Sequence, residues 1–167
     1  MRFLIVVLAS LTLAACQSSG PIHAAFDPQE AAFIKKKGAG AITGHAFLKR
    51  RSGINVYASG EVIRLTPVTA YSKERFARIY GARKFASAIA IPRLEVDPVY
   101  ASYTRTVKAD HMGRFRFDNV APGRYFVSTQ VTWSNQDDFF SQGGAMYDVV
   151  EISGREDRPV DVILSGN

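Results

Sequence analysis

Short runs of alternating hydrophobic and polar residues recur from residue 41 onward, and they predict β-strands. The runs are rich in Val, Thr, Phe and Tyr, and Gly, Pro, Asn or Asp separate them, which favours turns between strands. Each strand needs a facing sheet to bury its apolar side, so the pattern predicts an antiparallel β-sandwich. The predicted strands are 41–48, 54–58, 61–67, 103–109, 114–117, 124–133, 145–152 and 159–164.

Two local patterns refine this prediction. The Ser59–Gly60 pair lies between strands 54–58 and 61–67 and predicts that they form a hairpin. Residues 69–85 instead have helical spacing, with Ser72 as the predicted cap and Phe76 and Tyr80 four residues apart. We therefore expect one helical insertion over about 69–90. Its exposed face is expected to carry Lys73, Arg75, Arg78, Arg83 and Lys84, with Glu74 as the one acid.

The N-terminus has the pattern of an export signal. Arg2 is followed by an apolar run and by small residues that lead to Cys16. The run ends too soon for a transmembrane helix, which needs about 20 apolar residues. The segment resembles the signal of bacterial lipoproteins, which implies that Cys16 is acylated and tethers the chain to a membrane; Gln17 suits delivery to the outer membrane.

The chain accordingly divides into three parts: a lipoprotein signal peptide at 1–15, a tether at 16–40, and a sandwich domain at 41–167. Within the tether, Asp27 and Pro28 predict a helical turn, because Asp is a good N-cap and Pro a good first helical residue.

Composition narrows the chemistry. The 167 residues suffice for one domain, and one Cys with three His leaves no disulfide framework within the chain and no Cys-rich zinc site. The formal net charge of +6 favours an anionic partner. For an exported chain we expect an acidic glycan or anionic lipid, and no nucleic acid.

Residues 110–125 carry a motif of a known family. Gly113 follows Asp110 in a turn, Phe115 and Phe117 lie two residues apart on one face of a strand, and Pro122–Gly123 suits a type II turn before the next strand. The motif resembles that of the carboxypeptidase regulatory-like domain. This resemblance implies an all-β, antiparallel, seven- or eight-stranded Greek-key sandwich of the transthyretin (prealbumin) type, which is an accessory module without peptidase activity.

Catalytic patterns are weak in this sequence. It contains no GxSxG, HExxH, P-loop or Rossmann motif. Gly38–Ala39–Gly40 precedes a predicted strand, whereas a phosphate-binding glycine loop precedes a helix. His45, His111 and Asp110 lack metal-ligand spacing, so we predict no metal site, no catalytic residue and no cofactor. Hydroxyisourate hydrolases also have a transthyretin-like sandwich, so the resemblance leaves an enzyme as an alternative. The C-terminal residues of this chain, however, do not resemble those of the hydrolases.

Two groups of side chains are predicted to bind a partner. One is a basic cluster close to the tether. The other is an aromatic group beside Asp137 and Asp138, whose charges favour exposure of the loop and of one of its Phe rings, whereas the Trp is expected to be mostly buried. The predicted partner-binding residues are Lys49, Arg50, Arg51, Trp133, Phe139 and Phe140.

Two functions remain open on these observations. The first is a non-enzymatic, membrane-anchored lipoprotein of the cell envelope that binds an envelope protein or a surface polymer such as an acidic glycan. The second is a small periplasmic hydrolase of the transthyretin-like type. The missing catalytic motifs favour the first.

Overall fold

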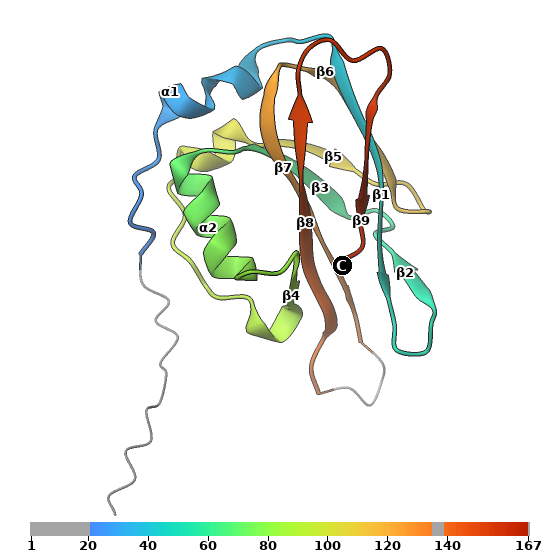
Figure 1. Ribbon diagram of the computed structural model, residues 1–167. Helices are drawn as coiled ribbons and strands as arrows, with labels where there is room; N and C mark the ends of the chain where they lie inside the picture. Colours follow the sequence, from blue (N-terminus) through green and yellow to red (C-terminus); the bar gives the residue numbers. More distant parts are fainter. Residues whose placement is uncertain (1–20, 135–138, 167) are drawn as a thin grey trace, which may run out of the picture.

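The computed structural model describes residues 21–134 and 139–166, and it has two facing β-sheets with helical segments outside them (Figure 1). Strands β1 to β9 form the sheets, and the helical segments are α1, α2 and three short 3₁₀ turns. The strands are β1 (Gly40–Lys49), β2 (Asn55–Tyr57), β3 (Val62–Pro67), β4 (Phe85–Ser87), β5 (Arg105–Lys108), β6 (Arg114–Val120), β7 (Gly123–Trp133), β8 (Gln142–Ile152) and β9 (Val160–Leu164). The helical segments are α1 (Pro28–Ala31), α2 (Ala70–Tyr80), Ala32–Lys35, Ala88–Ala90 and Tyr100–Tyr103.

The predicted all-β sandwich is confirmed. One sheet has the order β2-β1-β6, with β9 beside β1, and the other has the order β4-β8-β7-β3-β5. Neighbouring strands are antiparallel except for β1 and β9, which run parallel from the pair Ile42 and Val160 to the pair Ala46 and Leu164.

The main core lies between the sheets. Side chains on β1 alternate between buried and partly exposed, as the period of two in a strand requires. Ile42, Ile63, Leu65 and Phe117 are at most 1% exposed, and Tyr125 is fully buried among them. Burying each of these side chains stabilises the fold by roughly 1.5–3 kcal/mol. Tyr125 keeps its hydroxyl satisfied by donating to the Ala121 carbonyl at 2.7 Å.

The predicted hairpin of 54–58 with 61–67 is wrong. β2 pairs with β1, whereas β3 pairs with β5 and β7 in the other sheet. Gly60 does occupy a turn, with φ 73°, but its N–H donates to the carbonyl of Ala109. The turn therefore carries the chain from one sheet to the other. β4 is a further strand that the sequence did not predict, and its three residues are held by pairing with the edge of β8.

The helical insertion is present and covers the outer face of the five-stranded sheet (Figure 1). α2 begins one turn before the expected cap: Thr69 is the N-cap and forms a capping box with Ser72, which is the third helical residue. The Phe76 ring stacks on Phe126 of β7, with centroids 4.0 Å apart. The helix ends at Tyr80, so residues 81–90 of the predicted insertion lie beyond it.

The segment 21–39, expected to be part of a tether, packs on the domain. Its helical turn begins as predicted, with Asp27 capping α1 and Pro28 in the first position. Beyond it, Ile34 is 5% exposed within the main core, and Phe33 packs edge-on against Tyr125. The hydrophobic residues that the sequence analysis assigned to a linker thus extend the core. The predicted signal peptide and Cys16 lie outside the described residues.

Within residues 21–134 and 139–166, no helix is both long and apolar enough to cross a membrane.

Candidate functional site

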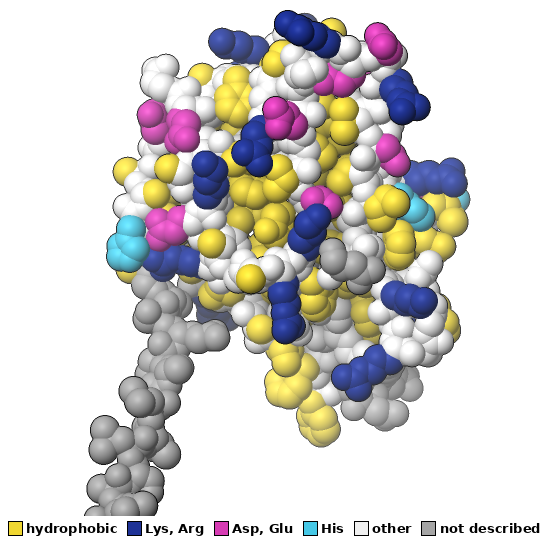
Figure 2. Space-filling view, in the orientation of Figure 1, with side chains coloured by type: hydrophobic (Ala, Val, Ile, Leu, Met, Phe, Trp, Pro, Cys, Tyr) yellow, Lys and Arg dark blue, Asp and Glu magenta, His cyan; other side chains and the backbone are white. Residues whose placement is uncertain are grey.

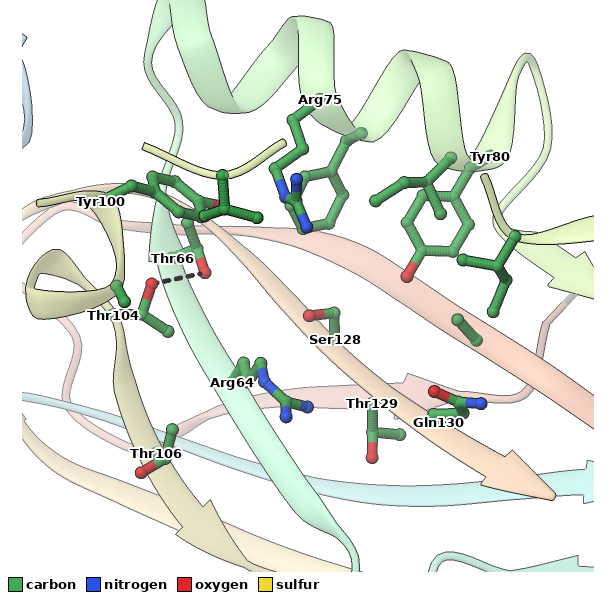
Figure 3. Close-up of a pocket in the computed structure, with 16 residues that line it drawn as sticks. Arg64, Thr66, Arg75, Tyr80, Tyr100, Thr104, Thr106, Ser128, Thr129 and Gln130 are labelled. Carbon is green, nitrogen blue, oxygen red and sulfur yellow. Dashed lines mark hydrogen bonds between the residues drawn. The ribbon is translucent and has the colours of Figure 1, made fainter. Parts of the chain in front are cut away.

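A cavity of about 390 Å³ lies between α2 and the outer face of β3, β5 and β7, and we call it the helix–sheet pocket (Figure 3). Its floor follows from the period of two in the strands. In β3, Ile63 and Leu65 point into the core, so Arg64 between them points outward. In β7 the outward side chains change along the strand, from Phe126 under the helix to Ser128 in the pocket.

Hydroxyl and amide groups dominate this floor. The Thr66 and Thr104 hydroxyls lie 3.4 Å apart, and the Thr129 hydroxyl donates to the carbonyl of Val62. The Thr129 hydroxyl can therefore only accept a hydrogen bond from a ligand, whereas Ser128 and Gln130 can both donate and accept. The polar floor residues other than Arg64 are Thr66, Thr104, Thr106, Ser128, Thr129 and Gln130.

Aromatic and apolar side chains form the walls. Tyr80 comes from α2, Tyr100 from the 3₁₀ turn before β5, and Ile91 and Val96 from the segment between them. Burial is the main cause that raises the pKa values of both tyrosines, so both hydroxyls stay protonated at neutral pH. Tyr80 and Tyr100 are 8% and 9% exposed, so only a small part of each side chain reaches the surface of the pocket.

Two guanidinium groups give the pocket its charge. Figure 3 shows Arg75 reaching into the space from α2 and Arg64 from the sheet. The NH1 atom of Arg75 is buried and has no hydrogen-bond partner. Among the described residues that line the pocket there is no Asp or Glu. The cavity is thus a cationic site with unused hydrogen-bond donors.

The sequence analysis missed this pocket. Arg75 was assigned to an exposed helix face, but it turns toward the sheet, while its neighbour Arg78 forms an ion pair with Glu74 at 2.7 Å. The feature of the sequence that could have indicated the pocket is the series of polar residues at outward positions of β3 and β7. The strand pattern alone did not indicate that a helix covers them.

The predicted partner-binding residues meet elsewhere, at the end of the sandwich where the β1–β2 turn approaches the ends of β7 and β8. All of them except Phe139 line a cleft of about 430 Å³, which we call the end cleft. Figure 2 shows hydrophobic and basic side chains at this end, at the bottom of the view. The structure therefore combines the basic and aromatic groups, which the sequence analysis treated as two surfaces. The lining residues that were predicted are Lys49, Arg50, Arg51, Trp133 and Phe140.

Within the end cleft, the Arg50 guanidinium carbon lies 5.0 Å from the centroid of the Trp133 ring. The indole N–H of Trp133 donates to Gln142 at 3.2 Å, and the ring is partly buried. Phe139 is 97% exposed and Phe140 is 72% exposed, so both rings face solvent. The acids that suggested this exposure, at positions 137 and 138, lie outside the described residues.

His45 and Asp110, two of the residues weighed as metal ligands, form contacts within the fold. His45 Nε2 lies 2.6 Å from the carbonyl oxygen of Met112, and its ring stacks on Tyr57. Asp110 accepts the backbone N–H groups of Arg114 and Met112, and these bonds lower its pKa. Over the part of the chain that the structure describes, no group of three or more His, Cys, Asp or Glu could hold a metal ion.

The fold is similar to that of a crystal structure described as a "putative carbohydrate binding protein" from Pseudomonas aeruginosa. The TM-score is 0.70 and the sequences are 31% identical, over 84% of this chain and 97% of the other. No protein-family model matches the sequence, and no curated protein matches it. The similarity thus extends over nearly the whole of the Pseudomonas protein.

Proposed function

Since the chain belongs to the same family as this Pseudomonas aeruginosa protein, we propose that it binds carbohydrate and that the helix–sheet pocket holds the sugar. The observation that carries the proposal is the convergence of hydroxyl, amide and guanidinium groups with tyrosine rings in one cavity of about 390 Å³. A volume of this size is ordinary for a small-molecule site.

The chemistry of a sugar suits these walls. Each sugar hydroxyl can both donate and accept a hydrogen bond. The side chains of Ser128 and Gln130 can also do both, so they can pair with it in either direction. The apolar face of a sugar ring can pack against the aliphatic side chains of the wall, Ile91 and Val96. Polar groups in fixed places then select the orientation of the sugar, and the apolar walls contribute binding energy.

Binding without catalysis is part of the proposal. Glycoside hydrolysis generally needs a pair of carboxyl groups on either side of the scissile bond. The described lining of the helix–sheet pocket supplies no carboxyl group and no histidine. The pocket composition therefore favours a binding module over the small hydrolase that the sequence analysis kept as an alternative.

The anchoring proposal rests on the sequence. Cys16 follows a hydrophobic export signal and small residues, and its acylation would tether the chain to a membrane. We propose an envelope lipoprotein of the outer membrane that holds its partner close to the membrane. Residues 21–39, which belong to the predicted tether, pack on the domain.

The relationship to the carboxypeptidase regulatory-like domain also remains a proposal. Gly113 has φ 76°, as its turn position requires, and Phe115 and Phe117 both face the core with ring centroids 6.2 Å apart. Gly123 differs from the proposed motif: its φ of 153° is far from the value near +80° of a type II turn.

A glycan panel followed by calorimetry tests carbohydrate binding. Ser128→Ala and Gln130→Ala should each weaken the binding of a glycan found on the panel by about five-fold, the worth of one hydrogen bond of about 1 kcal/mol. Thr132→Ala is the matched control, because Thr132 is exposed on the same face of β7 but does not line the pocket. Absence of binding to every glycan, or wild-type affinity in both pocket variants, would refute the proposal.

A further inference from the structure

We propose that the helix–sheet pocket selects an acidic sugar, whose anionic group binds between Arg64 and Arg75. This inference rests on the proposed function and names the class of sugar. The anionic group can be a carboxylate, as in a uronic acid, or a sulfate or phosphate ester, because a guanidinium fork matches all three.

The strongest evidence is the state of Arg75. Its NH1 atom is buried without a hydrogen-bond partner, and a buried charged donor left unpaired is costly. The guanidinium carbon lies 5.8 Å from the centroid of the Tyr100 ring, which holds the group at the pocket wall. An anionic group in the pocket would supply the missing acceptor.

The acid next to Arg75 in the sequence cannot act as this partner. The Glu74 carboxylate accepts the backbone N–H groups of His23 and Ala24 at 2.9 and 2.8 Å, and the Arg78 guanidinium at 2.7 Å. It is therefore committed to the N-terminal segment and to the other side of α2. Because no acid is present among the described lining residues, the charge of Arg75 is left for a ligand.

Arg64, an exposed residue of β3, adds a second cation from the floor of the pocket. Its NH1 donates to the Val62 carbonyl at the long distance of 3.4 Å, which takes one of its five N–H groups. The side chains of Arg64 and Arg75 both line the helix–sheet pocket. Two cations that border one cavity attract an anion more strongly than a single cation does.

The neighbours of the two arginines favour a sugar over a bare anion. Ser128 lies between the guanidinium groups in the view of Figure 3, and the Thr66 and Thr104 hydroxyls lie nearby. These neutral groups suit the hydroxyls of a sugar ring, while Ile91 and Val96 offer it apolar surface. A small inorganic ion would leave most of this lining unused.

Calorimetry with matched ligands tests the inference. The ligands are a trimer of galacturonic acid, the corresponding neutral galactose trimer, a sulfated galactose trimer and inorganic sulfate. We expect the wild-type protein to bind at least one acidic trimer ten-fold or more tightly than the neutral one. Arg75→Gln and Arg64→Gln should each abolish most of this preference, while the control Lys73→Gln, on the exposed side of α2, should keep it.

The outcomes separate the two proposals. Equal binding of neutral and acidic trimers would overturn the acidic-sugar inference and leave carbohydrate binding intact. Binding of inorganic sulfate without any trimer would overturn it as well, because the pocket would then be a simple anion site. Binding of no trimer and no panel glycan would overturn the proposed function itself. Thermal midpoints of the variants, measured in parallel, show whether a lost preference comes from unfolding.

Discussion

The ring of Phe26 stands edge-on to the ring of Tyr100, with centroids 5.6 Å apart and planes at 85°. Phe26 belongs to the segment that leads from the proposed anchor, and Tyr100 lines the helix–sheet pocket. Phe26 makes similar edge contacts with Tyr71 and Tyr103. The N-terminal segment thus packs directly behind one wall of the pocket.

Phe26→Ala should therefore affect both stability and binding. Each aromatic pair contributes about 0.5–1.5 kcal/mol beyond area burial, so loss of the Phe26 ring should lower the free energy of unfolding by about 2 kcal/mol. Sugar affinity should fall as well, because Tyr100 loses a supporting contact. Urea denaturation and calorimetry measure the two effects. Unchanged stability would show that residues 21–39 do not dock in solution.

Glu74 should make the docking of the N-terminal segment depend on pH. Its pKa is lowered from the ordinary 4.5 to about 2, first by the backbone N–H of His23 and then by that of Ala24. A lowered pKa means that the stabilisation is complete above the unfolded-state value and is lost as pH falls toward 2. Glu74→Gln should lower the urea midpoint at pH 7, and the difference from wild type should shrink between pH 5 and pH 2. Glu95→Gln, at an exposed position, serves as the control.

Alanine substitutions at two turn glycines should distinguish the cost of backbone strain from the cost of a steric clash. Gly53 has φ 87° and open space where a Cβ would lie, so Gly53→Ala should cost about 1 kcal/mol from strain alone. At Gly113, with φ 76°, a Cβ would also collide with the carbonyl oxygen of Ala46 in β1. Gly113→Ala should therefore destabilise the domain by clearly more than Gly53→Ala. Equal urea midpoints would argue against the close approach of the turn to β1.

The aromatic residues at the end of the sandwich that holds the end cleft should separate into two classes. Phe139 and Phe140 are largely exposed, so their replacement by Ala should change the free energy of unfolding by less than about 0.5 kcal/mol. Trp133 packs against the core, and Trp133→Ala should cost about 3 kcal/mol. If the end cleft binds a partner, the Phe139/Phe140 double variant should be stable and capture less of that partner from crosslinked cells. Normal capture by this stable variant would exclude the two rings from the interaction.

Cys16→Ser tests the anchor. The variant should remain an unacylated precursor that no longer partitions with membranes, because an acyl chain is the proposed means of attachment. Membrane fractionation with a fatty-acid label measures this. Unchanged labelling of the variant would contradict lipidation at this position.

Local rules in the sequence predicted a substantial part of the fold. Alternation with a period of two placed Phe115 and Phe117 on one buried face, and helical spacing identified Phe76 and Tyr80 as the buried side of a helix. The turn at Gly113 followed from its residue type. These features depend on neighbours within a few residues, so a single sequence contains the information that specifies them.

Tertiary structure decided the remainder. Whether the strand after Gly60 pairs with β2 or crosses to the other sheet depends on competition with β5 and β7, which are distant in the sequence. The pocket has the same origin: Arg64, Arg75 and Tyr100 come from a strand, a helix and a turn, and only packing of the insertion against the sheet brings them together. Periodicity indicates which side chains share a face of a strand or helix. Long-range packing determines which element covers that face and whether a cavity remains beneath it.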